Sequence, residues 1–130
     1  IESYEKAIEL DPDYAMAYYN LGLAYYDQGN HTKAIQSFEK AIELKPDYAA
    51  AYYNMGFAYY DQGNYTKAIE LYEKAIELDP DYAKAYNNRA VCYYFKEEYD
   101  KAWDDVYKAQ SLGYQLHPGF LKDLREASGR

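Results

Sequence analysis

Three asparagines stand 34 residues apart, at Asn20, Asn54 and Asn88. A primary amide both donates and accepts hydrogen bonds, so a row of such side chains could pair with successive peptide groups of an extended chain without reading its sequence. Each contact would contribute about 1 kcal/mol net, so three contacts alone predict weak binding. The structural alternative is that these amides cap neighbouring backbone groups. The sequence leaves both interpretations open.

Side chains suited to catalysis or metal binding are few and scattered. Cys92 is the only cysteine and takes the place of Ala24 and Ala58 in the preceding segments, which predicts a small buried residue. His31 and His117 are far apart and have no third ligand to complete a metal site. Carboxylates are plentiful, but the sequence places no pair of them in an apolar pocket. We therefore predict a protein that is not an enzyme, with no catalytic residue, no metal and no cofactor.

An internal repeat positions these side chains. Residues 15–48 and 49–82 align without gaps and differ at 8 of 34 positions. Residues 83–116 keep the same spacing, although their second half diverges. Self-similarity at this period is the mark of a repeat protein, in which each unit is one small structural element. We interpret the three segments as repeats 1, 2 and 3.

The two ends of the chain differ from the full units. Residues 1–14 repeat the sequence of residues 69–82 almost without change, Pro12 included, so we interpret them as the second helix of a truncated repeat. Residues 117–130 leave the pattern, and Pro118 suits a first helical turn. Because a terminal repeat exposes an apolar face, we predict that this last segment is a C-terminal capping helix.

Each unit has the pattern of two helices. In residues 49–82, apolar residues first recur three and four positions apart, which predicts one buried helical stripe. Gly63 can take the left-handed conformation that ends this helix. A second helix follows over about residues 65–78, and Pro80 prevents its continuation. The whole chain is therefore predicted to be an all-α solenoid of antiparallel helix pairs, with about eight helices.

The residues at the key packing positions resemble the signature of the tetratricopeptide repeat. The first unit carries all eight signature residues, Tyr18, Leu21, Gly22, Tyr25, Ala34, Phe38, Ala41 and Pro46. The second unit carries them again with conservative changes. The third departs from the signature at four positions, Arg89, Ala90, Val106 and Tyr114. On this resemblance, residues 1–116 are identified as tetratricopeptide repeats.

The resemblance implies a right-handed superhelix in which the first helix of each unit lines a concave groove for a peptide or helix of a partner protein. Helical projection places thirteen residues there: Tyr19, Asn20, Leu23, Tyr26, Tyr53, Asn54, Phe57, Tyr60, Lys84, Asn87, Asn88, Val91 and Tyr94. Tyrosine supplies rigid contact area at low entropic cost. The asparagine row resembles the ladder by which the repeats of O-GlcNAc transferase hold peptide backbones.

A second precedent within the family does not fit. Co-chaperone repeats that bind the acidic tail of heat-shock chaperones use a lysine and an asparagine in their first unit, where this chain has Tyr19 and Leu23. Asn54, Lys84 and Asn88 resemble parts of that carboxylate clamp, but Asn88 replaces its arginine. Burying two carboxylates requires compensating cations. We therefore do not expect an acidic tail as the ligand.

Charge and hydropathy restrict the partner. The 14 Lys and Arg against 22 Asp and Glu give a formal charge of −8, which disfavours nucleic acid and favours basic partners. The longest apolar stretches are only a few residues, so we expect no membrane insertion. A protein or peptide is the expected partner. The compartment is not determined by the sequence, with the cytoplasm slightly favoured.

Two alternatives to a peptide-binding scaffold remain. The truncated repeat has an apolar face that could pair with a second copy or stack end to end, formed by Ile1, Tyr4, Ala7 and Ile8. The repeats could also be the targeting arm of a larger enzyme. The irregular third unit indicates a natural, bacterial-type sequence rather than a consensus design.

Overall fold

The computed structural model describes residues 1–11 and 13–130, so Pro12 of the predicted truncated repeat lies outside the described residues. The described residues form eight α-helices. They are α1 (Glu2–Leu10), α2 (Ala15–Asp27), α3 (His31–Leu44), α4 (Ala49–Asp61), α5 (Tyr65–Leu78), α6 (Ala83–Phe95), α7 (Tyr99–Ser111) and α8 (Pro118–Ser128).

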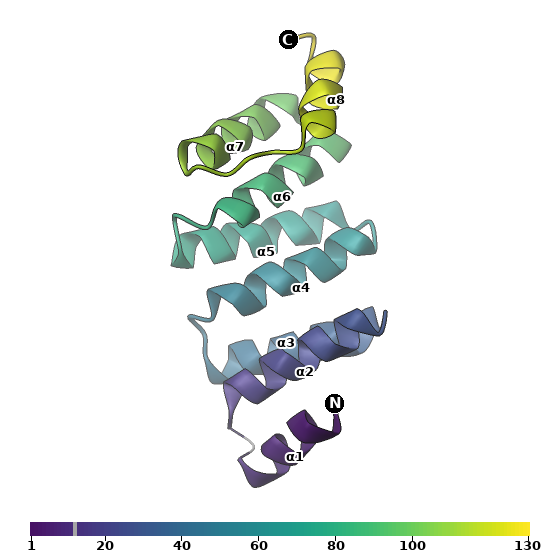
Figure 1. Cartoon of the computed structure of the whole chain (residues 1–130), viewed down its shortest axis with the longest axis vertical. Helices are drawn as coiled ribbons and strands as arrows, with labels where there is room; N and C mark the ends of the chain where they lie inside the picture. Colours follow the sequence, from purple (N-terminus) through teal and green to yellow (C-terminus); the bar gives the residue numbers. More distant parts are fainter. Residues whose placement is uncertain (12) are drawn as a thin grey trace.

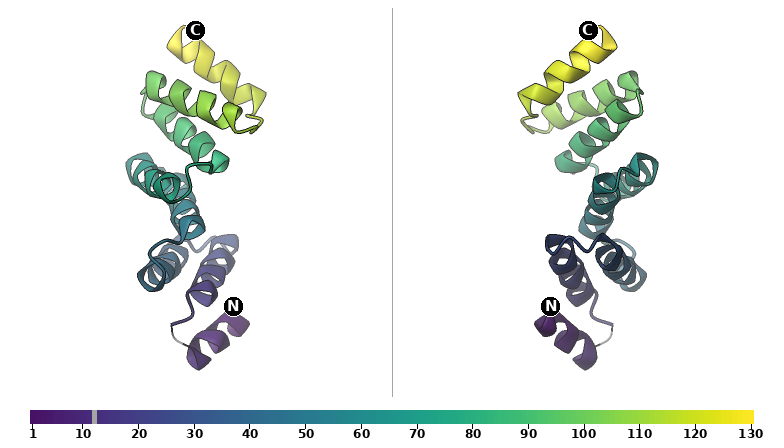
Figure 2. Two further views of the ribbon diagram at one scale, coloured as in Figure 1. Left: turned by 90° about the vertical axis from the view of Figure 1, so that its left-hand side faces the viewer. Right: turned by 90° about the vertical axis from the view of Figure 1, so that its right-hand side faces the viewer.

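The helices stack in chain order into an elongated molecule (Figures 1 and 2). The pairs α2–α3, α4–α5 and α6–α7 pack together, and α3–α4 and α5–α6 contacts join one pair to the next. The termini lie at opposite ends of the stack (Figure 1). The prediction of an all-α protein built from adjacent antiparallel helix pairs is confirmed.

Short turns separate the two helices of the first and second units. Gly63 follows α4 with φ of +77°, a left-handed conformation that ends the helix without a steric clash. The side chain of Asn64 then accepts a hydrogen bond from the Lys67 N–H at 3.2 Å, which caps α5. Gly29 and Asn30 repeat this turn one unit earlier. The turn therefore fixes where each second helix begins.

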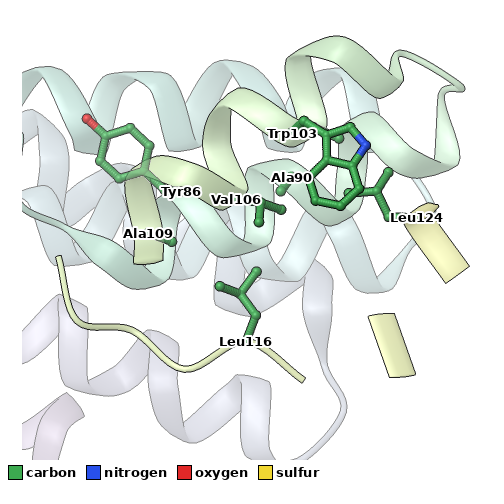
Figure 3. Packing of buried hydrophobic residues seen from close by; sticks show 8 residues of the cluster. Tyr86, Ala90, Trp103, Val106, Ala109, Leu116 and Leu124 are labelled. Atoms are coloured by element: carbon green, nitrogen blue, oxygen red, sulfur yellow. The ribbon is translucent and has the colours of Figure 1, made fainter. Parts of the chain in front are cut away.

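Small residues let the two helices of a unit pack closely. A Cβ at Gly22 would lie 2.6 Å from the Phe38 ring, closer than real carbon atoms approach. The second unit repeats this close approach at Gly56. The third unit has Ala90 in place of the glycine and Val106 in place of the aromatic residue, and both lie in one buried cluster (Figure 3). Loss of the glycine there is matched by loss of the aromatic ring.

α8 covers the last repeat. Leu124 of α8 is fully buried beside Trp103 and Val106 (Figure 3). The Trp103 indole N–H also donates a hydrogen bond to Ser128 Oγ at 3.0 Å. Leu116, from the segment that leads into α8, completes this cluster. The C-terminal segment thus buries apolar surface that α7 would otherwise expose.

Candidate peptide-binding face

The first helices of the units form one continuous surface. α2 contacts α4, and α4 contacts α6, which brings equivalent residues of the three units into rows. We call this surface the inner face. Of the thirteen predicted groove residues, Lys84 is exposed and the other twelve are half-buried. The face is therefore accessible only in part, and its side chains also contact one another.

Two members of the asparagine row, Asn54 and Asn88, donate hydrogen bonds from one unit to the next. The Asn54 amide donates to the Tyr19 hydroxyl at 2.9 Å and to the Ala50 carbonyl at 2.9 Å. Asn88 donates to the Tyr53 hydroxyl at 2.9 Å in the same arrangement one repeat later. Both donors of Asn54 are thus engaged within the protein, and its side-chain oxygen remains as an acceptor.

The tyrosines that receive these bonds keep their own protons. The Tyr19 and Tyr53 hydroxyls each accept from an asparagine, and no acceptor for their own O–H lies within the part of the chain that the structure describes. Burial raises the pKa of both tyrosines, and the asparagine bonds offset part of the rise. The hydroxyls therefore stay protonated at neutral pH. They are two donors that this surface can offer to a ligand.

Turn tyrosines hold these donors in place. The Tyr48 ring stacks on Tyr19 with centroids 4.9 Å apart, and Tyr82 stacks on Tyr53 at the same 4.9 Å. Each pair joins the first helix of one unit to the turn that precedes the next unit. Stacked aromatic pairs of this kind stabilise the junction and restrict the rotamer of the inner tyrosine.

A pocket opens at the junction of the second and third units. Its volume is about 530 Å³, and it contains the Tyr19 and Tyr53 side chains together with Asn54. The remaining lining residues come from the turn, the start of α6 and the segment before α8: Asp79, Asp81, Tyr82, Ala83, Lys84 and Tyr114. Projection of the first helices alone missed Asp79, Asp81, Tyr82, Ala83 and Tyr114. The replacement of Lys45 by Asp79 between nearly identical units was the available sequence signal.

A second group of aromatic side chains lies near the other end of the first helices. Tyr26 contacts Phe57 with ring centroids 5.6 Å apart, and Tyr60 contacts Phe95 at 6.4 Å. The Tyr26 hydroxyl donates to the Asp61 carboxylate of the next unit. Burial raises the pKa of Tyr26, and the neighbouring Asp61 raises it further. The Tyr26 contacts join the first unit to the second, and the Tyr60–Phe95 contact joins the second unit to the third.

The structure separates the remaining predicted residues from the pocket. Tyr94 packs on Phe120 of α8 with ring centroids 5.8 Å apart, so part of its surface is in contact with α8. Asn87 donates to the Asn88 side-chain oxygen at 3.0 Å. Asn20, Leu23 and Val91 are half-buried on the inner face and do not line the pocket.

The residues predicted for self-association are half-buried. They lie on α1, which packs against α2 and contains no fully buried residue, and they are Ile1, Tyr4, Ala7 and Ile8. The face that they form is therefore partly covered, and self-association through it stays a prediction.

Two unusual polar groups have structural explanations. The Arg89 guanidinium donates two hydrogen bonds to Asp105, at 2.8 and 2.7 Å, where the second unit has Met55 and Leu71. Burial raises the pKa of Asp105, and Arg89 lowers it in part. Cys92 is fully buried, and burial raises the pKa of its thiol to about 12, so it is a poor nucleophile.

The described part of the chain contains neither a metal site nor a helix that could span a membrane. No group of three or more His, Cys, Asp or Glu side chains in residues 1–11 and 13–130 could hold a metal ion. None of the helices described is long and apolar enough to cross a membrane.

Sequence profiles of one family match most of the chain. A profile described as TPR repeat matches residues 1–29 and 22–63. Two profiles described as tetratricopeptide repeat match residues 49–82 and 71–104. No curated protein matches the chain.

Solved structures give the same result. The chain is similar to a crystal structure of MamA at 38% identity and a TM-score of 0.83, covering 86% of this chain and 66% of that one. A second structure, titled MamA protein, has 30% identity and a TM-score of 0.84, with 98% and 71% covered. The first TPR of Spaghetti (RPAP3), bound to the HSP90 peptide SRMEEVD, shares the fold at 23% identity and a TM-score of 0.80, with 88% and 90% covered. Domains of this kind mediate protein–protein interactions and are typically non-catalytic scaffolds, and this chain belongs to the tetratricopeptide repeat family.

Proposed function

We propose that this chain is a scaffold that holds an extended peptide segment of a partner protein against the inner face. The observation that carries the proposal is the repeated tyrosine–asparagine bond between units. It leaves two hydroxyl donors, on Tyr19 and Tyr53, next to an amide acceptor on Asn54. An extended peptide presents carbonyl oxygens and N–H groups in alternation, which is the complementary pattern.

The proposal changes the role of the asparagine row. A ladder in which each amide both donates to and accepts from the peptide would need the asparagine donors, and the protein itself uses both donors of Asn54 and one of Asn88. In the proposed arrangement the asparagines orient the tyrosines, and the tyrosines donate to the ligand. Because the hydroxyls are fixed before binding, little side-chain entropy is lost when the peptide arrives.

The solved structure of the RPAP3 repeat supports peptide binding as a use of this fold, since that domain is bound to a peptide. Its ligand SRMEEVD is acidic. The present chain has Tyr19 and Leu23 where an acidic tail would need a lysine and an asparagine, so it should select a different peptide.

The test combines a peptide array with tyrosine variants. Array peptides bound by the unaltered protein are titrated against Tyr19→Phe, Tyr53→Phe and the double variant. Each lost hydroxyl should weaken binding roughly fivefold, because a net hydrogen bond contributes about 1 kcal/mol. Tyr107→Phe is the matched control, since Tyr107 is an exposed tyrosine on α7.

Two results would contradict the proposal. One is an array on which no peptide binds. The other is a set of bound peptides whose affinity the Tyr19 and Tyr53 variants leave equal to that of Tyr107→Phe. Thermal unfolding of each variant shows whether a loss of binding is simply a loss of fold.

A further inference from the structure

At the junction between the first and second units, the ammonium group of Lys45 lies against an aromatic ring and a carboxylate. The Lys45 ammonium lies 5.0 Å from the centroid of the Tyr48 ring. It also lies 3.8 Å from the Asp47 carboxylate. An aromatic face together with a carboxylate is a favourable environment for an ammonium group. Lys45 and Tyr48 also line a pocket of about 400 Å³, together with Tyr14, Ala15 and Met16 from the turn before α2 and its first residues.

The junction between the second and third units has the same environment without the lysine. Tyr82 and Asp81 stand 34 residues after Tyr48 and Asp47, and Tyr82 stacks on Tyr53 as Tyr48 stacks on Tyr19. The position equivalent to Lys45 is Asp79, so a second carboxylate replaces the cation. All three residues of this junction, Asp79, Asp81 and Tyr82, line the pocket of about 530 Å³.

We infer that this larger pocket binds a lysine or arginine side chain of the bound peptide, in the place that Lys45 occupies one repeat earlier. The inference rests on the proposed function and deepens it, because it assigns a basic residue to the ligand. The formal charge of −8 favours the approach of a basic peptide to the whole molecule. The pocket selects a cation locally, through two carboxylates and the Tyr82 ring.

Lys84 is the one positive group in the lining of this pocket. Its equivalent in the second unit is Ala50, so the ammonium is not required by the repeat. A ligand cation in the pocket would be repelled by Lys84, and an acidic ligand would be attracted by it. Removing Lys84 therefore distinguishes a basic ligand from an acidic one.

The probes are end-blocked peptides of about nine residues, or ~30 Å when extended, in a neutral background. Lys, Arg, norleucine or Glu occupies the central position. Binding is followed by NMR titration of the whole chain, which detects weak complexes and locates them. The Lys and Arg peptides should bind roughly threefold to tenfold more tightly than the norleucine peptide, and salt should reduce this preference.

The repeat itself supplies the variants. Asp79→Lys introduces the residue found one unit earlier. It should abolish the preference for Lys and Arg, because the new ammonium group would occupy the place of the ligand's cation. Lys45→Asp should create a second site at the first junction. Lys84→Ala should strengthen binding of the Lys peptide. Matched changes of charge away from the pocket, Glu39→Lys for the first variant and Lys122→Asp for the second, should have only small effects.

Different experimental results would contradict the two proposals. If the norleucine peptide binds the inner face as tightly as the Lys peptide, the cation pocket is wrong and the peptide scaffold stands. If Asp79→Lys keeps the cation preference, or Lys84→Ala weakens binding of the Lys peptide, the cation pocket is also wrong. If none of the four peptides shifts inner-face resonances, both proposals are contradicted.

Discussion

The hydroxyl of Tyr72 is a polar atom without a partner in the core. The residue is fully buried on α5, and its oxygen has no hydrogen-bond partner among the residues that the structure describes. Burial raises the pKa of Tyr72 and the nearby Asn88 amide lowers it in part, so the phenol stays neutral. The first unit has Phe38 at the same position, so the fold does not need the oxygen there. An unpaired buried hydroxyl costs about 1–3 kcal/mol.

We predict that Tyr72→Phe increases the free energy of unfolding by about 1 kcal/mol, because it removes the unpaired oxygen and keeps the ring. Denaturant unfolding measures the change. Tyr53→Phe is the informative control, since it deletes a hydroxyl that accepts from Asn88 and should lower stability. A clear loss of stability in Tyr72→Phe would mean that its hydroxyl has a partner, such as the Asn88 amide or a buried water.

At the scale of elements, the third unit shows what happens when the turn loses its usual residues. The turn before α7 has Glu97 and Glu98 where the second unit has Gly63 and Asn64. Glu97 has φ of +62°, a conformation that disfavours any residue with a side chain. Glu98 makes no capping bond to α7. The fold keeps the geometry of the turn and loses the residues that stabilise it.

Grafting the turn of the second unit should therefore stabilise the protein. Glu97→Gly removes the steric cost of the left-handed conformation, and Glu98→Asn supplies a helix cap. Together they should raise the free energy of unfolding by about 1 kcal/mol or more. Thermal unfolding compares this variant with Glu97→Gln/Glu98→Gln, which removes the same charges without changing the backbone preference. If the two variants were equally stable, the stability of this turn would depend on the removed charges and not on the backbone conformation.

Sequence periodicity predicted the helices because each buried stripe and each helix stop is a local property of the chain. It could not predict the pocket, because the lining comes from separate elements. Tyr53 belongs to α4, Lys84 to α6, and Tyr114 to the segment before α8. The hydrogen bond from Asn54 to Tyr19 spans two units, and residue spacing alone does not show which amide is already engaged. The buried pair of Arg89 and Asp105 likewise depends on two helices meeting.

The whole molecule is a stack in which each helix contacts mainly its neighbours. Stability in such a stack is close to a sum of unit and junction contributions, so damage at one end should stay there. The two ends also differ in burial. α1 has no buried residue, while α7 has five, and four of these form a cluster with Leu124 of α8. Local opening should therefore begin at α1 in the unaltered protein.

Leu124→Ala tests this view of the molecule. The substitution leaves a cavity beside Trp103 and should destabilise the cap by about 2–5 kcal/mol. Hydrogen exchange followed by mass spectrometry should then show faster exchange in α7 and α8, with little change in α2 and α3. Phe38→Ala, which removes a fully buried ring from α3, should give the opposite pattern. If either substitution accelerates exchange equally in all helices, the stack unfolds as one cooperative unit. In that case a peptide bound at the second junction would stabilise the distant ends as strongly as its own site.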